Sequence, residues 1–383
     1  MQIGQQMFVA FGITPATNWN MDETGLTWAI GPTHMFVPEG QARAIGSPNA
    51  KARITAVIAV NGEGTFAPLM IILKHSISSL TRPDQTAMRV CATLHKEEGF
   101  RSDDGWDLLT WSRMLTLPGK KKAQTFTAEH KCLYLKHRES GHVITSQHKA
   151  WNDTVRMAMW MDLIMLPIRQ RDGKMLLWSD NCGPHKTQAI KELFEALGIH
   201  TAWLPPNMTS LLQVLDLVVN GPIKAHVRKL RAQRIVEYFS GFQAKYLEEI
   251  KKPELERVRL KFKPPNPSYQ QAIRDLFALF AARGSFTSES FKKGVVQSFV
   301  ETGTQPRVGT SSFKEFTERD EAVKVKVDPS FRTLDGQGRE VHDAINAYLD
   351  GDDSDKASDD GVHAGDSDNE EEVDIDPSDD EDI

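Results

Sequence analysis

The stretch Lys174–Leu204, KMLLWSDNCGPHKTQAIKELFEALGIHTAWL, places two short apolar runs on either side of an amphipathic segment. Lys174–Asp180 and His200–Leu204 have the length and apolar character of strands. Between them, Thr187–Leu197 repeats apolar residues at helical spacing, and Gly198 follows as a helix-ending residue. The pattern predicts a β-α-β unit with two parallel strands and a right-handed crossover.

Upstream, two apolar runs predict an antiparallel hairpin. Arg53–Asn61 and Thr65–Leu73 are aliphatic and β-branched, and an Asn-Gly turn dipeptide stands at their junction. Asn18–Asp22 predicts a further short strand that ends on an acid. Trp151–Leu166 has apolar residues at helical spacing, and we expect Pro167 to end that helix. A hairpin followed by alternating strands and helices indicates an α/β fold with a mixed sheet flanked by helices.

Two helices are expected after the β-α-β unit. Pro205-Pro206-Asn207 forces a turn, a helix follows, and Gly221-Pro222 interrupts the helical pattern. The second helix is strongly basic. It is either a solvated face or a surface that contacts the DNA backbone. Its candidate DNA-binding residues are Lys224, Arg228, Lys229, Arg231 and Arg234.

Charge is distributed unevenly along the 383 residues, although the net charge is only −6. Residues 350–383 contain 17 acidic residues and one lysine, which leaves 45 basic and 35 acidic residues in positions 1–349. The acidic tail has few large apolar residues and is expected to be disordered. The excess of positive charge in the body favours a polyanionic partner such as DNA, and the tail could also contact the basic body.

Composition excludes other classes of protein. No apolar run approaches the ~20 residues that cross a bilayer, and the N-terminus lacks the pattern of a signal peptide. A membrane protein and a secreted protein are therefore not expected. The three cysteines, Cys91, Cys132 and Cys182, form no Cys-x-x-Cys pair, which favours a reducing compartment over a disulfide framework.

Three aspartates occupy informative positions. Asp22 and Asp180 end predicted strands, and Asp216 lies in the helix after the last strand. The carboxyl ends of strands and the adjoining loops line the crevice of an α/β layer, so the three side chains could converge there. Converging carboxylates repel unless a cation binds, and their oxygens favour Mg²⁺ or Mn²⁺. Aspartates at strand ends also close turns, so the spacing alone leaves both interpretations open.

The sequence segments around these aspartates resemble the three catalytic blocks of DDE-type transposases. They are Asn20–Gly25 (NMDETG), Trp178–His185 (WSDNCGPH) and Leu204–Asp216 (LPPNMTSLLQVLD). The similarity is greatest to the pogo-like branch of the mariner superfamily, which is related to centromere protein B and jerky-like proteins. It runs from about residue 18 to 234 and more weakly to about 303. Val214 departs from the family, which usually has proline there.

The resemblance implies a ribonuclease-H-like catalytic domain that cuts and rejoins DNA with two divalent ions, Mg²⁺ or Mn²⁺. By that resemblance Asp22, Asp180 and Asp216 are the catalytic residues and metal ligands. It also implies a nuclear location and a homodimer. Family members carry helix-turn-helix modules before the first block. Only 21 residues precede Asp22, so specific binding of transposon ends by this chain alone is not expected.

Residues beside the aspartates have more than one interpretation. Glu23 adjoins Asp22 but points to the opposite face of a strand, which favours a structural or outer position over a fourth ligand. Asn181 and His185 are candidates for orienting a metal-bound water or contacting phosphate, and they could equally stabilise the turn. The rival to an enzyme is a domesticated or decayed nucleic-acid-binding protein without catalytic activity.

The expected domain organisation follows from these patterns. Residues 1–240 form the catalytic domain, with 81–150 as an insertion or elaboration. A proline-rich linker occupies 241–267, and 268–349 form a helical, partly irregular C-terminal extension. The disordered acidic tail is 350–383.

Overall fold

The computed structural model describes residues 2–27, 53–74, 90–118, 125–206, 208–258, 260, 268–281 and 284–306. These residues belong to one compact unit, which lies within residues 1–329. The predicted acidic tail at 350–383 and the end of the predicted linker, 261–267, lie outside the described residues.

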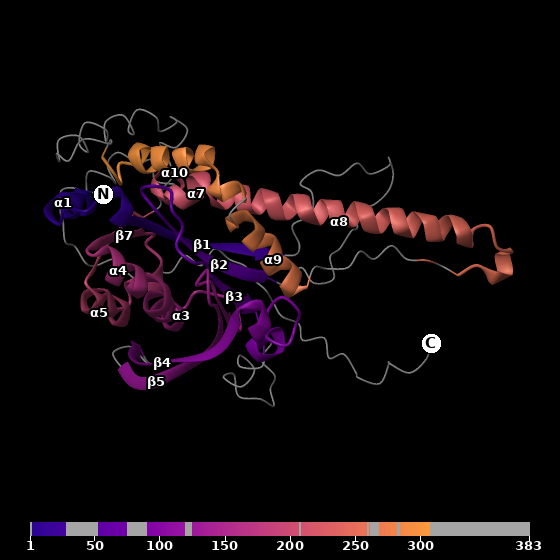
Figure 1. The fold of residues 1–383 in the computed structure, drawn as a ribbon, viewed down its shortest axis with the longest axis horizontal. Helices are drawn as coiled ribbons and strands as arrows, with labels where there is room; N and C mark the ends of the chain where they lie inside the picture. The colour runs from indigo at the N-terminus through magenta and orange to yellow at the C-terminus, as the bar shows by residue number, and fades with distance from the viewer. Residues whose placement is uncertain are drawn as a thin grey trace, which may run out of the picture. The chain divides into compact units, whose positions relative to one another are not determined.

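The core of this unit is an eight-stranded mixed sheet within the described residues (Figure 1). Its spatial order is β4-β5-β6-β3-β2-β1-β7-β8. The strands are β1 (Asn18–Thr27), β2 (Arg53–Asn61), β3 (Met70–Lys74), β4 (Trp106–Pro118), β5 (Thr125–His137), β6 (Val143–Gln147), β7 (Met175–Ser179) and β8 (Ile199–Trp203).

Five of these strands include the predicted hairpin and the predicted β-α-β unit. β2 pairs antiparallel with both β1 and β3, whereas β7 pairs parallel with β1 and β8 parallel with β7. In the order β3-β2-β1-β7-β8, only β2 therefore runs against the other strands. This confirms the mixed sheet, the hairpin and the parallel β-α-β unit that the sequence predicts.

Helices cover both faces of the sheet (Figure 1). One hydrophobic core lies beneath α3 and α5, where Met21 and Leu177 of the sheet pack with Ile190. A second core lies beneath α7, α9 and α10, where Ile58 packs in a cluster with Leu215. The helices are α1 (Gln2–Ala10), α3 (Thr154–Trp160), α4 (Leu166–Asp172), α5 (Gln188–Leu197), α6 (Thr209–Leu212), α7 (Val214–Val218), α8 (Asn220–Glu249), α9 (Tyr269–Phe280) and α10 (Glu289–Glu301).

Pro167 does not end the helix that precedes it, so that prediction was wrong. A π-helical turn at Met161–Met165 joins α3 to α4, and Pro167 lies in the first turn of α4. Within the turn the Leu166 N–H donates a hydrogen bond to the carbonyl of Met161, five residues earlier, instead of the four-residue spacing of an α-helix. Proline lacks a donor and clashes with the preceding turn of a regular helix, and a π turn is one way to accommodate it.

The predicted insertion extends the sheet beyond β3. β6 pairs parallel with β3, and β4 and β5 form a ribbon paired from Trp106–His137 to Pro118–Thr125. The ribbon is fixed to the helical layer because the Trp111 indole donates to Asp162 Oδ2 at 2.9 Å, and Arg113 pairs with the same carboxylate.

The C-terminal helices belong to the same core as the sheet. α8 continues through the expected domain boundary at 240 to Glu249, and Figure 1 shows it extending well beyond the sheet. Ile273 of α9 and Phe299 of α10 are fully buried in the cluster beneath the sheet. Among the described helices, none is long and apolar enough to cross a membrane.

The half-buried His142 offers a test of this packing. Its Nδ1 accepts a hydrogen bond from the Leu69 N–H at 2.9 Å, and its ring stacks on Phe277. Burial, with a smaller effect of His137, lowers its pKa from 6.5 to about 4. The folded state therefore favours neutral imidazole, and this contribution to stability is complete above pH 6.5 and lost as the pH falls toward 4.

We expect the free energy of unfolding to fall by about 2 kcal/mol between pH 8 and pH 5 through His142 alone, because the unfolded chain gains the proton first. Urea unfolding at the two pH values measures this change. His142→Leu cannot titrate and should show a correspondingly smaller loss. An equal loss in the parent and the variant would contradict the assignment.

Candidate active site

Two adjacent acids in the middle of β1 point to opposite faces of the sheet, and the strand continues to Thr27, so the prediction that it ends at Asp22 was wrong. Alternation along the strand puts Asp22 on the face of α7 and Glu23 on the face of α3. β1 and β7 run parallel, with Asn20 opposite Trp178. Asp22 and Asp180 both come two residues after this pair, Asp22 within β1 and Asp180 just beyond the end of β7.

Gln213 brings Asp216 to the same place. Its side chain is fully buried, accepts a hydrogen bond from Asn20 Nδ2 at 3.1 Å and donates to the Met21 carbonyl at 2.7 Å. Its extended backbone separates α6 from α7. The amide thus fixes the start of α7 against β1, and Asp216 lies in the first turn of that helix.

Asn220, at the start of α8, joins two of the predicted ligands. Its Nδ2 donates to Asp22 Oδ2 at 2.7 Å and to Asp216 Oδ1 at 2.9 Å. Because one amino group reaches both carboxylates, the strand acid and the helix acid are immediate neighbours. Asp22 is buried, whereas Asp216 is exposed and opens this cluster to solvent.

The charge at Asp22 is poorly compensated. Burial raises its pKa well above the ordinary value, and the nearby charges of Asp216, Glu23 and Asp180 raise it further. The ionised form of Asp22 is therefore disfavoured in the fold as it stands. A bound cation would reverse this effect, because an opposite charge nearby favours a carboxylate.

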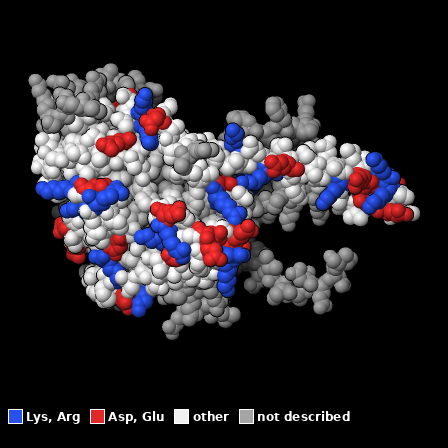
Figure 2. Space-filling model, in the orientation of Figure 1, with Lys and Arg blue, Asp and Glu red and all other residues white. Residues whose placement is uncertain are grey.

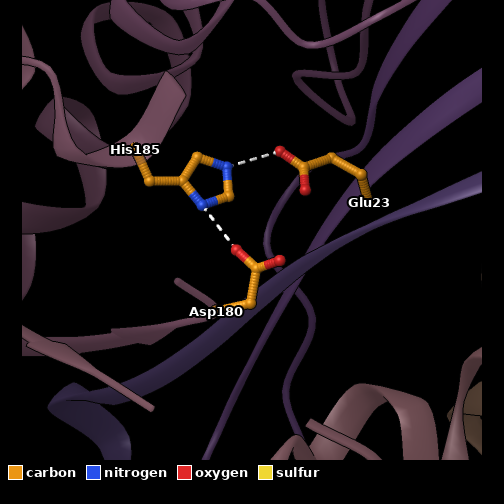
Figure 3. Close-up of side chains that lie close together, drawn as sticks. All are labelled: Glu23, Asp180 and His185. Atoms are coloured by element: carbon orange, nitrogen blue, oxygen red, sulfur yellow. Dashed lines mark hydrogen bonds and ion pairs between the residues drawn. The ribbon is translucent and has the colours of Figure 1, made fainter. Parts of the chain in front are cut away.

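His185 compensates the other two acids (Figure 3). Its ring is fully buried, with Nδ1 2.8 Å from Asp180 Oδ1 and Nε2 2.7 Å from Glu23 Oε1. Burial opposes charge on the ring, but the bonds to Asp180 and Glu23 outweigh it and raise the pKa of His185 to about 10. The ring is thus an imidazolium at neutral pH. Asn152 also donates to Glu23 Oε1.

Asp180 is held in its ionised form. Burial acts to raise its pKa, but His185, the Cys182 N–H at 3.1 Å and the charge of Lys186 together lower it below the ordinary value. The pKa values of Asp180 and Asp22 are therefore shifted in opposite directions by their surroundings. Such separation is common at catalytic sites and also occurs in structural ion-pair networks.

Two sets of residues could hold a cation. Among the described residues, Glu23, Asp180 and His185 have ligand atoms within 4.8 Å of one another. However, the imidazolium uses each ring nitrogen for a different carboxylate and so takes the place of a cation between them. Asp22 and Asp216 instead share only a neutral amide. Two carboxylate oxygens beside an amide fit a hard cation such as Mg²⁺ or Mn²⁺.

The structure thus brings Asp22 and Asp216 into one cluster and places Asp180 beside it, linked to His185. The catalytic roles of the three remain predictions. His185 is fully buried against Asp180, and its predicted role toward a metal-bound water or a phosphate remains a prediction. The role of Asn181 also remains a prediction. Its half-buried side chain has an Oδ1 without a hydrogen-bond partner in the described part of the chain.

Three contributors were missed by sequence reasoning: Asn152, Gln213 and Asn220. Asn220 stands one helical turn after Asp216, a spacing that places both on one face and could have identified it. Gln213 lies inside the third motif, three residues before Asp216. Asn152 is remote from all three motifs, and nothing in the sequence pattern marks it.

The basic residues of α8 divide into two groups. Arg234 forms a two-pronged ion pair with Asp275 of α9, with both N–O distances 2.6 Å, so its guanidinium joins two helices of the protein. Arg228 and Lys229 are exposed, and Lys224 and Arg231 are half-buried. Figure 2 shows Lys and Arg interspersed with acids along α8 on the face in view.

Part of the sequence matches a known protein family. Residues 119–255 match the family model described as DDE superfamily endonuclease. The matched segment contains Asp180 and Asp216, while Asp22 lies upstream of it. No curated protein matches the chain.

Among solved structures, the chain is similar to Mos1 transposases. The Mos1 paired-end complex with the left transposon end is 9% identical, with a TM-score of 0.37 over 79% of this chain and 58% of that one. The Mos1 mariner paired-end complex with Mn is 11% identical, with a TM-score of 0.36 over 79% and 60%. The chain thus spans less than two thirds of the length of these proteins.

The His185 bridge predicts a large effect on stability. His185→Gln leaves Glu23 and Asp180 without their cation in a largely desolvated site, which should lower the free energy of unfolding by about 3–5 kcal/mol. Adding Glu23→Gln should restore part of the loss, because one unpaired carboxylate is then removed. Chemical denaturation measures both variants.

The matched control is His148→Gln, which makes the same substitution outside the site. It should change the free energy of unfolding by far less. A His185→Gln protein as stable as this control would show that the bridge is not a stabilising ion pair.

Proposed function

We propose that this protein is a metal-dependent DNA endonuclease or strand transferase that acts on phosphodiester bonds. The observation that carries the proposal is the Asn220 amide bound to both Asp22 and Asp216, beside an ionised Asp180. The match of residues 119–255 to the DDE endonuclease family supports the same reaction class.

The proposed ligands are Asp22, Asp180 and Asp216, with two divalent ions, Mg²⁺ or Mn²⁺. Such ions supply Lewis-acid activation of the attacking water and stabilise the leaving 3′-oxygen. The protein's own residues prepare the site. His185 holds Asp180 ionised and oriented, Gln213 fixes α7 against β1, and the exposure of Asp216 leaves one side open to a large substrate.

Finer assignments belong to the same proposal. A transposase of the pogo-like branch of the mariner superfamily is supported by the three motif words quoted above. A nuclear location and a homodimer follow from that assignment. Contact between the acidic tail, 350–383, and the basic body is supported by their opposite net charges.

The reaction can be tested by nicking of supercoiled DNA in Mn²⁺ or Mg²⁺. Asp180→Asn should lower the rate at least about 100-fold, because the site loses one of the carboxylates proposed to hold the divalent ions. Asp107→Asn is the matched control, since Asp107 is a β4 surface carboxylate paired with Arg138, and it should cut like the parent. Equal activity in Asp180→Asn and the parent would refute the assignment.

A second candidate is a nucleic-acid-binding protein without catalysis. The exposed Arg228 and Lys229 on α8 favour DNA binding whether or not the site cuts. This candidate gives salt-sensitive binding to DNA and no metal-dependent cleavage. The nicking assay therefore separates it from the enzyme.

DNA binding through α8 has its own test. Lys229→Gln should weaken binding to unrelated duplexes alike and reduce the slope of log K against log salt by about 1, the effect of losing one phosphate contact. The control Lys293→Gln removes an exposed lysine from α10 instead. Identical salt slopes for the two variants would argue against contact through α8.

A further inference from the structure

Asn220 contacts two carboxylates of the acidic cluster through one end of its amide, and the other end has no partner in the described part of the chain. The residue is 4% exposed, and its Nδ2 is shared between Asp22 and Asp216. Its Oδ1 is buried and has no hydrogen-bond partner within the described part of the chain. A buried amide oxygen without a partner costs free energy, so its retention calls for a physical reason.

The amide can present either of its ends to the two carboxylates. A half-turn about the terminal side-chain bond exchanges the nitrogen and the oxygen within the same volume. Without a cation, the donor end faces the acids, and the Asp22 and Asp216 oxygens accept its two hydrogen bonds. With a cation beside the carboxylates, the oxygen end becomes the favourable one, since amide oxygens are ordinary ligands of hard divalent ions.

We propose that Asn220 is a further ligand of a divalent cation at Asp22 and Asp216, and that its amide turns from donor to oxygen ligand when the cation binds. The inference rests on the proposed function, because it takes Asp22 and Asp216 as the cation-binding pair. It assigns to Asn220 a role that the three motif aspartates do not cover. The orphaned Oδ1 then has its partner in the loaded state.

An alternative role for Asn220 predicts the opposite result. If the amide only donates to the carboxylates, it competes with the cation for their oxygens, and removing it should leave cation binding unchanged or make it tighter. If Oδ1 is a ligand, removing it should weaken binding. The sign of the change therefore decides between the two roles.

The experiment measures Mn²⁺ binding to the full chain by electron paramagnetic resonance of the free ion, without DNA. Asn220→Leu is close in size to asparagine and has neither donor nor ligand. We expect it to weaken Mn²⁺ binding about 10-fold or more, the range found when groups that support a metal site are removed. Asn220→Asp keeps an oxygen and should bind at least as tightly as the parent. Unchanged or tighter binding in Asn220→Leu would overturn the inference.

Two further variants keep the test decisive. Asn220→Ala removes the same atoms without the bulk of leucine, and it replaces Asn220→Leu if that variant does not fold, as judged by circular dichroism. Asp22→Asn tests the underlying site. If Asp22→Asn binds Mn²⁺ like the parent, or the parent binds none, the proposed function fails together with the inference. If Asp22→Asn loses Mn²⁺ binding while Asn220→Leu and Asn220→Ala keep it, only the role of Asn220 is wrong.

Discussion

Mutual repulsion among four carboxylates around the middle of β1 is the constraint on which the rest of the site depends. The charges of three of them, Glu23, Asp180 and Asp216, raise the pKa of the fourth, the buried Asp22. The fold answers the repulsion differently on its two sides. An imidazolium separates Glu23 from Asp180, and a neutral amide separates Asp22 from Asp216.

This asymmetry follows from strand geometry. Successive residues of β1 point to opposite faces, so Asp22 meets the helices that follow β8 while Glu23 meets α3 and the turn after β7. The face with His185 carries a positive charge between its two carboxylates. On the opposite face, the contacts that Asp22 and Asp216 make with the described residues include no positive charge, which favours a cation there.

The sequence predicts the elements with strong local signals. The β7-α5-β8 unit and the β2-β3 hairpin have clear hydrophobic periods and turn residues, and both form as expected. Pro167 was misread because a π-helical turn depends on packing that no local pattern records. Asp22, Asp180 and Asp216 were found because the three sequence motifs contain them. Asn152 was missed because its partner Glu23 lies 129 residues away in the chain, whereas the local spacing of Asn220 from Asp216 could have identified it.

Residues 303–305 form hydrogen bonds with segments near the N-terminus. Gln5 of α1 donates to the Gly303 carbonyl, Asn18 of β1 donates to the carbonyl of Thr304, and Gln305 reaches the carbonyl of Gly62. These bonds join positions more than 240 residues apart, and closing such long loops before any contact forms is entropically slow. During synthesis, β1 must therefore wait for nearly 300 residues before its last neighbours emerge from the ribosome. A fragment limited to the family match at 119–255 would lack β1, β2 and β3, and with them the strands on which its own β6 and β7 depend for pairing.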